Sequence, residues 1–212
     1  MATLDMHEQE QVDALKAWWK ENGKWAMAAL LLALLSFAAV RGWQIWRAQQ
    51  GQQAATLFAG VVQQMASNDP KRIGDAASAV VDKFGSSAYA PRAQLLAAQA
   101  DIQAKDAAQA KSRLQWVIDH ASEAGLQNAA RLKLASLLLD EKDYAGALGL
   151  LDAKHPAAFD GLYADIKGDV LFAEGKADEA RLAYQAALGK TDDKDVYHSL
   201  IQMKLDALEG AK

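Results

Sequence analysis

The 212-residue sequence contains no cysteine, only three prolines and no run of lysines or arginines. Without cysteine there is no disulfide, no thiolate nucleophile and no Cys ligand for zinc, a composition compatible with an oxidising compartment. The lack of a basic run argues against nucleic-acid binding and against a polybasic lipid patch. Few prolines and abundant alanine favour helices throughout the chain.

Patterns typical of catalysis or metal binding are also missing. The four histidines are too widely spaced for two of them to share one helix face. No Ser/His/Asp constellation, Gly-rich phosphate loop or carboxylate–histidine metal motif occurs. Asp192, Asp193 and Asp195 suggest calcium, but no loop of oxygen ligands follows them, so we interpret them as an acidic helix start. The sequence predicts a protein that is not an enzyme and carries no cofactor or metal.

One long apolar run is present, at residues 25–40. It has sixteen residues without a charge and lies between Lys24 and Arg41. As a helix it is about 24 Å long, slightly short of a hydrocarbon core, and residues 42–46 extend it. Five of the six tryptophans lie at its two ends, where membrane–water interfaces favour them: Trp18, Trp19, Trp25, Trp43 and Trp46. We predict a transmembrane helix over residues 25–46.

Two other interpretations of this run remain. Ser36-Phe37-Ala38 offers small residues at the spacing of a signal-peptide cleavage site, although the preceding segment is long and acidic rather than short and basic. The run is also compatible with the core helix of a soluble domain, for which sixteen uncharged residues are unusual.

The segments on either side of the run have distinct patterns. Residues 1–24 form a predicted cytoplasmic segment, within which 5–21 is an amphipathic helix for the membrane surface or for a partner, ending or kinking at Asn22-Gly23. Three lysines precede the run and two arginines follow it, a bias that places the N-terminus in the cytoplasm. Residues 47–69 are predicted as a helical stalk. Asp69-Pro70 is typical of a helix start, and the helix over residues 70–84 ends at Gly85.

A helical repeat follows in three copies, at residues 93–117, 130–154 and 163–188. Each copy reads as two helices joined by a tight turn, with small residues where the helices approach each other. We expect Ala135 to face Ala147 and Gly168 to face Ala180. Asp101 departs from the pattern, because it stands where a large apolar residue is usual. Residues 54–84 resemble a degraded fourth copy, with Ala76, Ala77 and Phe84 on its second helix.

The third copy closely resembles the tetratricopeptide repeat. Because one helical hairpin cannot bury its apolar face alone, neighbouring hairpins are expected to stack. The last helix, with an apolar face of Val196, Tyr197, Leu200, Ile201, Leu205 and Leu208, is expected to cap the stack. The predicted fold is all-α: a single transmembrane helix followed by a tetratricopeptide-repeat-like α-solenoid at residues 70–212.

A stack of hairpins presents a concave surface built from the first helix of each pair. We interpret it as a largely apolar groove for a partner segment or an unfolded client. Alternatively, the terminal helix or the stalk covers the same residues. The predicted groove consists of Arg92, Leu95, Gln99, Ile102, Leu132, Ser136, Leu139, Leu162, Asp165, Asp169 and Phe172.

The whole sequence resembles the YfgM family, the ancillary subunits of the bacterial SecYEG translocon, most specifically in LKAWWKENGKW at residues 15–25. The resemblance implies a single-pass inner-membrane protein whose repeat domain lies in the periplasm. It also implies association with SecYEG, partnership with the PpiD-like membrane-anchored chaperone and help in handing over newly translocated, unfolded clients.

Two rival functions remain open on the sequence. The first is an envelope signalling adaptor whose repeats sequester a stress-response regulator, which a cytoplasmic repeat domain would favour. The second is an anchored accessory subunit of an unrelated envelope enzyme.

Overall fold

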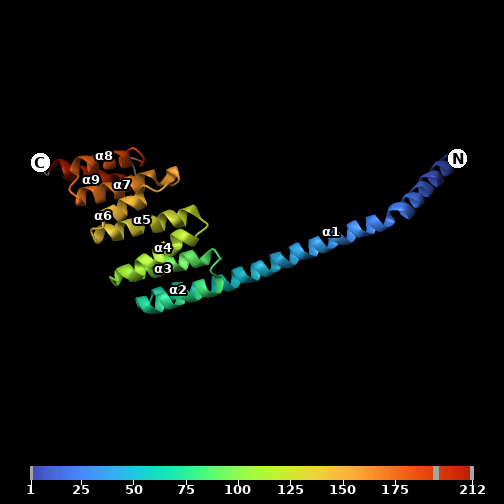
Figure 1. Ribbon diagram of the computed structural model, residues 1–212, viewed down its shortest axis with the longest axis horizontal. Helices are drawn as coiled ribbons and strands as arrows, with labels where there is room; N and C mark the ends of the chain where they lie inside the picture. The colour runs from blue at the N-terminus through green and yellow to red at the C-terminus, as the bar shows by residue number, and fades with distance from the viewer. Residues whose placement is uncertain (1, 193–195, 211–212) are drawn as a thin grey trace. The chain divides into compact units, whose positions relative to one another are not determined.

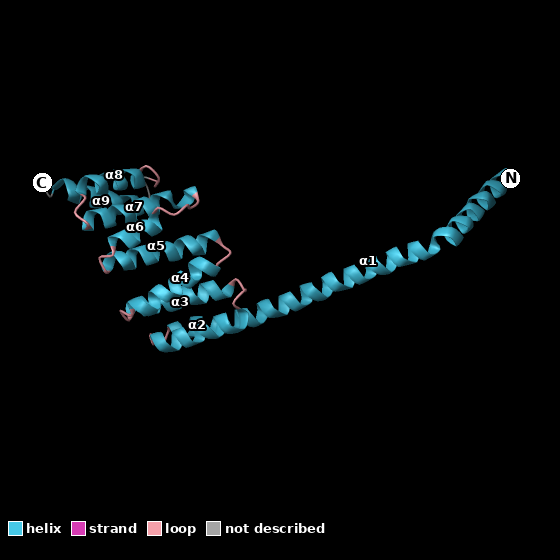
Figure 2. Ribbon diagram, viewed as in Figure 1, coloured by secondary structure: helices cyan, strands magenta, loops and turns pink. Residues whose placement is uncertain are grey.

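The computed structural model describes residues 2–192 and 196–210, and the side chains of residues 10–192 and 196–208. The chain divides into two compact units, Met1–Gln52 and Gln53–Lys212. The first unit is helical, the second consists of helices joined by short loops, and no strand occurs in the ranges described (Figure 2). The prediction of an all-α chain is confirmed.

The first unit consists of one helix, α1 (Ala2–Met65), which continues into the second unit. It passes through Asn22 and Gly23 without a helix end, so of the two predicted alternatives, an end or a kink, the end is wrong. Figure 1 shows a bend in the blue N-terminal part of α1. The Trp19 ring lies over Gly23, where an added Cβ would come within 3.2 Å of the indole nitrogen.

The second unit is a stack of helical hairpins that follow one another in chain order (Figure 1). The end of α1 and α2 form the first, and α9 closes the stack. A short 3₁₀ helix, η1 (Ala157–Phe159), precedes α7. The helices of the stack are α2 (Pro70–Phe84), α3 (Tyr89–Gln103), α4 (Ala107–His120), α5 (Ala124–Asp140), α6 (Tyr144–Leu151), α7 (Asp160–Ala173), α8 (Ala177–Leu188) and α9 (Val196–Gly210).

The turns repeat one backbone geometry at equivalent positions. Lys105, Lys142 and Gly175, which join the helices of the three predicted copies, have φ values of 61°, 64° and 89°. Left-handed residues of this kind end a helix by letting the next amide bond back to its last turn. Asn68, between α1 and α2, also has a positive φ, of 50°.

Short acidic side chains start several of the helices. Asp69 accepts hydrogen bonds from the amides of Lys71 and Arg72 at 3.0 and 3.3 Å, with Pro70 in the first turn as predicted. Asp106 and Asp143 likewise cap α4 and α6. Each cap satisfies amides that the helix itself leaves unbonded.

The end of α1 belongs to the core of the second unit. Val61 is fully buried and packs with Ile73, Ala77 and Val80 of α2, while Leu57 and Phe58 contact the same cluster. Residues 54–65, which the sequence assigned both to a stalk and to a fourth repeat, therefore form the first helix of a hairpin.

The helix pairs approach each other partly as expected. Ala135 and Ala147 are fully buried in one core cluster. The atoms nearest to a Cβ at Gly168 belong to the ring of Tyr184, the closest of them at 2.5 Å. Tyr184 therefore fills the space that Gly168 leaves open, and Ala180 is buried in the same core cluster as Tyr184.

Gly168→Ala is expected to lower the free energy of unfolding by about 1–3 kcal/mol, because Tyr184 is buried and the added methyl overpacks the α7–α8 contact. Gly149→Ala in α6 is the matched control, since its Cβ would have no neighbour within 4 Å. This control is expected to stabilise by about 0.5–1 kcal/mol through helix propensity. Urea unfolding followed by circular dichroism measures both, and equal effects would contradict the packing argument.

Candidate functional site

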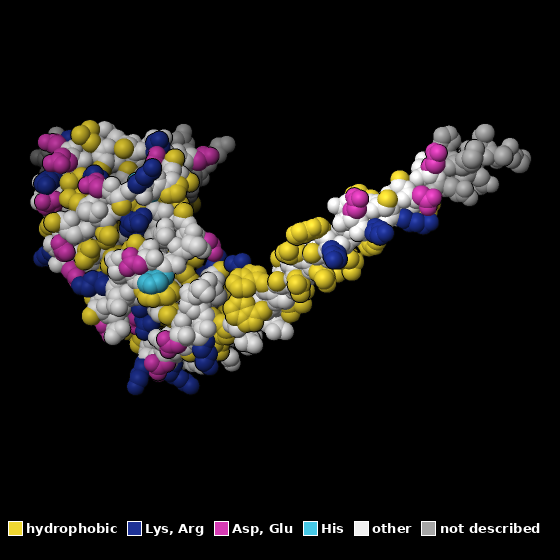
Figure 3. Space-filling view, turned by 45° about the vertical axis from the view of Figure 1, so that its right-hand side comes forward, with side chains coloured by type: hydrophobic (Ala, Val, Ile, Leu, Met, Phe, Trp, Pro, Cys, Tyr) yellow, Lys and Arg dark blue, Asp and Glu magenta, His cyan; other side chains and the backbone are white. Residues whose placement is uncertain are grey.

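The apolar part of α1 is long and apolar enough to cross a membrane, with a mean hydropathy of 1.8 and almost no burial against other residues. Hydrophobic side chains cover its middle, with Lys and Arg on either side (Figure 3). All five tryptophans at its ends are exposed, Trp25 most of all. Trp18 lies beside Trp19, and Trp43 beside Trp46, with ring centroids 6.4 and 5.5 Å apart.

The α3 part of the predicted groove is half-buried and partly occupied by side chains of the next repeat. Arg92 pairs with Glu123 at 2.8 Å and also donates to the carbonyl of Ala88. Gln99 accepts a hydrogen bond from Lys133 at 2.9 Å. The apolar members of this part, Leu95 and Ile102, pack against a core cluster shared with α4 and α5.

The α5 and α7 parts of the predicted groove differ in accessibility. Leu132 is buried in the core between α5 and α7 and is not open to a partner, contrary to the expectation. Leu139 is half-buried against the same cluster, and Ser136 bonds to the carbonyl of Leu132. Leu162 and Phe172 are exposed.

The acidic members of the predicted groove hold the terminal helix. Lys204 of α9 lies 2.8 Å from both Asp165 and Asp169. The hydroxyl of Tyr197 donates to Asp165 at 2.6 Å, and that of Tyr184 donates to Asp169 at 2.7 Å. Asp165 is only 3% exposed, so α9 covers this end of the groove, as the alternative interpretation held.

The capping face of α9 is narrower than predicted. Ile201, Leu205 and Leu208 are buried against α8 and α7. Val196 and Leu200 are 85% and 45% exposed and point away from this core, so their assignment to the buried face is wrong. Each residue is rotated by 100° from the previous one around a helix. The contacts of Lys204 with Asp165 and Asp169 therefore fix the rotation of α9 about its axis, and with it the side that faces inward.

The polar contacts under α9 predict a loss of stability at alkaline pH. Burial and a hydrogen bond to a carboxylate raise the pKa of Tyr184 and Tyr197 above the ordinary value. Burial opposes the charge of Lys204, but its hydrogen bonds to Asp165 and Asp169 outweigh that and raise its pKa. The contribution of these three groups to the free energy of unfolding is therefore fully present below about pH 10. It is lost as pH rises further, because the groups release their protons at lower pH in the unfolded chain than in the folded one.

Urea unfolding of the full chain in detergent at pH 8, 9.5 and 11 tests this expectation. The triple variant Tyr184→Phe, Tyr197→Phe and Lys204→Met removes the groups that titrate. We expect it to be less stable at pH 8 and to lose less further stability at pH 11 than the unaltered protein. An equal alkaline loss in both proteins would assign the effect to other groups.

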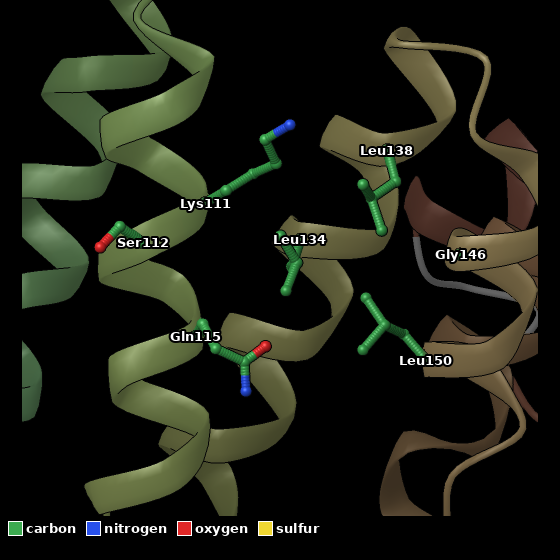
Figure 4. Close-up of a pocket in the computed structure, with 7 residues that line it drawn as sticks. All are labelled: Lys111, Ser112, Gln115, Leu134, Leu138, Gly146 and Leu150. Atoms are coloured by element: carbon green, nitrogen blue, oxygen red, sulfur yellow. The ribbon is translucent and has the colours of Figure 1, made fainter.

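An apolar hollow that the sequence did not predict lies between α4, α5 and α6 (Figure 4). Its volume is about 440 Å³. Leu134, Leu138 and Leu150 line the space from α5 and α6, and Lys111 and Gln115 project toward it from α4. The hollow would accept one large or two smaller apolar side chains of another polypeptide.

The glycines of α6 are not a sequence signal for this hollow. Gly146 lines the hollow, and Gly149 is exposed in the middle of the helix with open space at its Cβ position. A Cβ at Gly146 would clash with the carboxylate of Asp143, which caps α6, so the cap rather than the hollow explains this glycine. Two of the three helices that line the hollow, α4 and α6, are second helices of hairpins and lie outside the surface of first helices that the sequence predicted.

No group of three or more His, Asp or Glu side chains that would hold a metal ion occurs in the part of the chain that the structure describes. The residues gathered here are apolar side chains on helix surfaces and ion pairs between neighbouring helices. This arrangement is suited to binding polypeptides and lipid.

Comparison with known proteins identifies the family of the chain. Residues 16–210 match the family described as a tetratricopeptide repeat-like domain. The chain is 34% identical over 205 residues to the "Ancillary SecYEG translocon subunit" of Neisseria gonorrhoeae, covering 96% of this chain and 98% of that one. It is 27% identical over 208 residues to the protein of the same name from Escherichia coli, covering 95% and 97%. No solved structure matched the chain. The chain therefore belongs to the family of the ancillary SecYEG translocon subunits, the YfgM family.

Proposed function

We propose that the chain is a single-pass bacterial inner-membrane protein and an accessory subunit of the Sec translocon. The observation that carries this proposal is the extent of the similarity, which covers 96% of this chain and 98% of the gonococcal relative. The similarity to this relative therefore includes both the apolar anchor helix and the repeat stack, and not a generic repeat domain alone. The name of that relative supplies the translocon as the proposed partner.

The orientation in the proposal has the N-terminus in the cytoplasm and the repeat domain in the periplasm. Lys16, Lys20 and Lys24 precede the apolar run, whereas only Arg41 and Arg47 follow it closely. Positive charge near a span favours the cytoplasmic side. A protease-sensitive or alkylatable tag at Lys212 tests this orientation, and cytoplasmic exposure of the tag would reverse it.

The repeat domain acts as a scaffold rather than an enzyme in this proposal. Its contact surface for newly translocated clients, or for a PpiD-like membrane-anchored chaperone, is the hollow between α4, α5 and α6. The apolar side chains Leu138 and Leu150 are only half-buried there, so a partner would remove them from water. The exposed Phe172 on α7 supplies a second apolar contact.

Site-specific photocrosslinking in intact cells tests the function. A photoreactive residue at Leu31 probes the span, and one at Gln115 probes the hollow. The control is the exposed turn residue Lys142. We expect translocon subunits to be captured from Leu31, and secreted chains or a membrane-anchored chaperone from Gln115 well above the control. Capture of a soluble regulator alone would favour the signalling adaptor and overturn the proposal.

A further inference from the structure

We propose that α1 binds the headgroup of one anionic phospholipid through Lys20 and Lys24, with Lys16 and Trp19 beside it. The inference rests on the membrane anchor of the proposed function and adds an anionic phospholipid as its ligand. It does not depend on the translocon or on clients.

Helical geometry brings the three lysines together. Lys16, Lys20 and Lys24 are four residues apart, so they lie on one side of α1 in successive turns, about 6 Å apart along the axis. The sequence has no basic run because three other residues separate each pair of lysines. The helix therefore brings three positive charges to one side of this segment, although the sequence contains no run of basic residues.

The charges at this site are available to a ligand. Among the described residues no ion-pair partner is found for Lys20 or Lys24. Lys16 pairs with Asp13 at 3.2 Å, but both side chains are more than 70% exposed, and pairs of this kind are weak. Glu21 is the other carboxylate on this stretch, and it moderates the attraction without cancelling three ammonium groups.

An apolar surface lies next to the lysines. Leu15, Lys16, Trp18, Trp19 and Lys20 border a hollow of about 600 Å³ whose lining is largely apolar. The Trp19 ring packs over Gly23 on the same stretch of helix. The rings of Trp18 and Trp19 provide an apolar surface beside the ammonium groups that the phosphate reaches.

The depth of the site in the membrane indicates a lipid as the source of the phosphate. Lys24 is the last charged residue before the apolar run that begins at Trp25, so its ammonium lies at the level of the headgroups. An anionic lipid is favoured over a zwitterionic one because the latter carries a cation of its own. Each lysine near an anionic surface strengthens binding by about fivefold.

Native mass spectrometry of the full chain tests the site. The protein is released from nanodiscs that contain equal amounts of phosphatidylglycerol and phosphatidylcholine, and the retained lipids are counted. We expect retention of phosphatidylglycerol over phosphatidylcholine. Lys20→Gln with Lys24→Gln is expected to lower this preference by about tenfold, somewhat less than two full lysine contributions because Glu21 is close. High salt is expected to weaken the preference as well.

Two further variants make the result specific. Lys71→Gln with Lys83→Gln removes the same charge from α2 and is expected to leave the preference unchanged. Glu21→Gln is expected to raise it. Equal retention of both lipids by the unaltered protein, or an unchanged preference in the Lys20/Lys24 variant, would overturn the inference.

Carbonate extraction of the same protein from liposomes separates this inference from the proposed anchor. A chain that resists extraction but shows no preference for phosphatidylglycerol would sink the lipid site alone. A chain that is extracted would sink the anchor and the lipid site with it.

Discussion

Deletion of residues 1–52 is expected to leave a folded repeat domain that no longer sediments with membranes, whereas deletion of residues 1–69 is expected to disrupt its first hairpin. The compact unit begins at Gln53, and the longer deletion removes Leu57, Phe58 and Val61 from the core shared with α2 and α3. Burial of such side chains contributes about 1.5–3 kcal/mol each, so the loss is of the order of the whole stability of a domain.

Circular dichroism melts and membrane sedimentation of the two fragments measure this difference. The 53–212 fragment is expected to unfold cooperatively, with its ellipticity per residue unchanged after heating and cooling. The 70–212 fragment is expected to lose the helicity of α2 and to melt at a lower temperature. Equal melting of both fragments would show that the end of α1 contributes nothing to the fold, contrary to the burial of Val61.

Arg113→Met is expected to destabilise the repeat domain by about 3–5 kcal/mol. The guanidinium of Arg113 donates to Asp101 at 2.7 Å and to Gln94 at 2.9 Å. The side chains of Arg113 and Asp101 are only 15% and 6% exposed. Removing Arg113 leaves a buried carboxylate without its partner, which costs far more than the pair contributes when intact.

A second substitution at the same contact separates charge from packing. Asp101→Leu added to Arg113→Met removes the buried charge and restores the apolar residue usual at this repeat position. The double variant is therefore expected to regain most of the lost stability in urea unfolding. Arg181→Met is the control, because its partner Asp178 is 90% exposed and the pair is worth less than about 1 kcal/mol. A double variant no more stable than Arg113→Met would contradict the explanation.

The same contact shows why Gly74 stands in the middle of α2. A Cβ at Gly74 would lie 2.5 Å from a guanidinium nitrogen of Arg113. Nothing in the local sequence of α2 reveals this, because Arg113 is 39 residues further along the chain. The unusual Asp101 was visible in the repeat pattern, but its partner was not.

Local sequence determined the features that depend on neighbours along the chain. The uncharged run and its flanking tryptophans predicted an apolar helix, Asp69-Pro70 predicted a helix start, and the spacing of small residues predicted the hairpins. Helix periodicity, capping and hydrophobicity act within a few residues, so a short window contains the necessary information.

The tertiary structure alone decided which side of each helix remains open. Asp165 and Asp169 read as groove residues until Lys204, 35 or more residues away, was found to pair with them. Leu132 is buried for the same reason, since α7 packs onto α5. The hollow beside Gly146 exists because α4 and α6 stand apart over α5. These outcomes depend on contacts between segments that are far apart in the chain. A local pattern of residue types cannot predict the energies of such contacts.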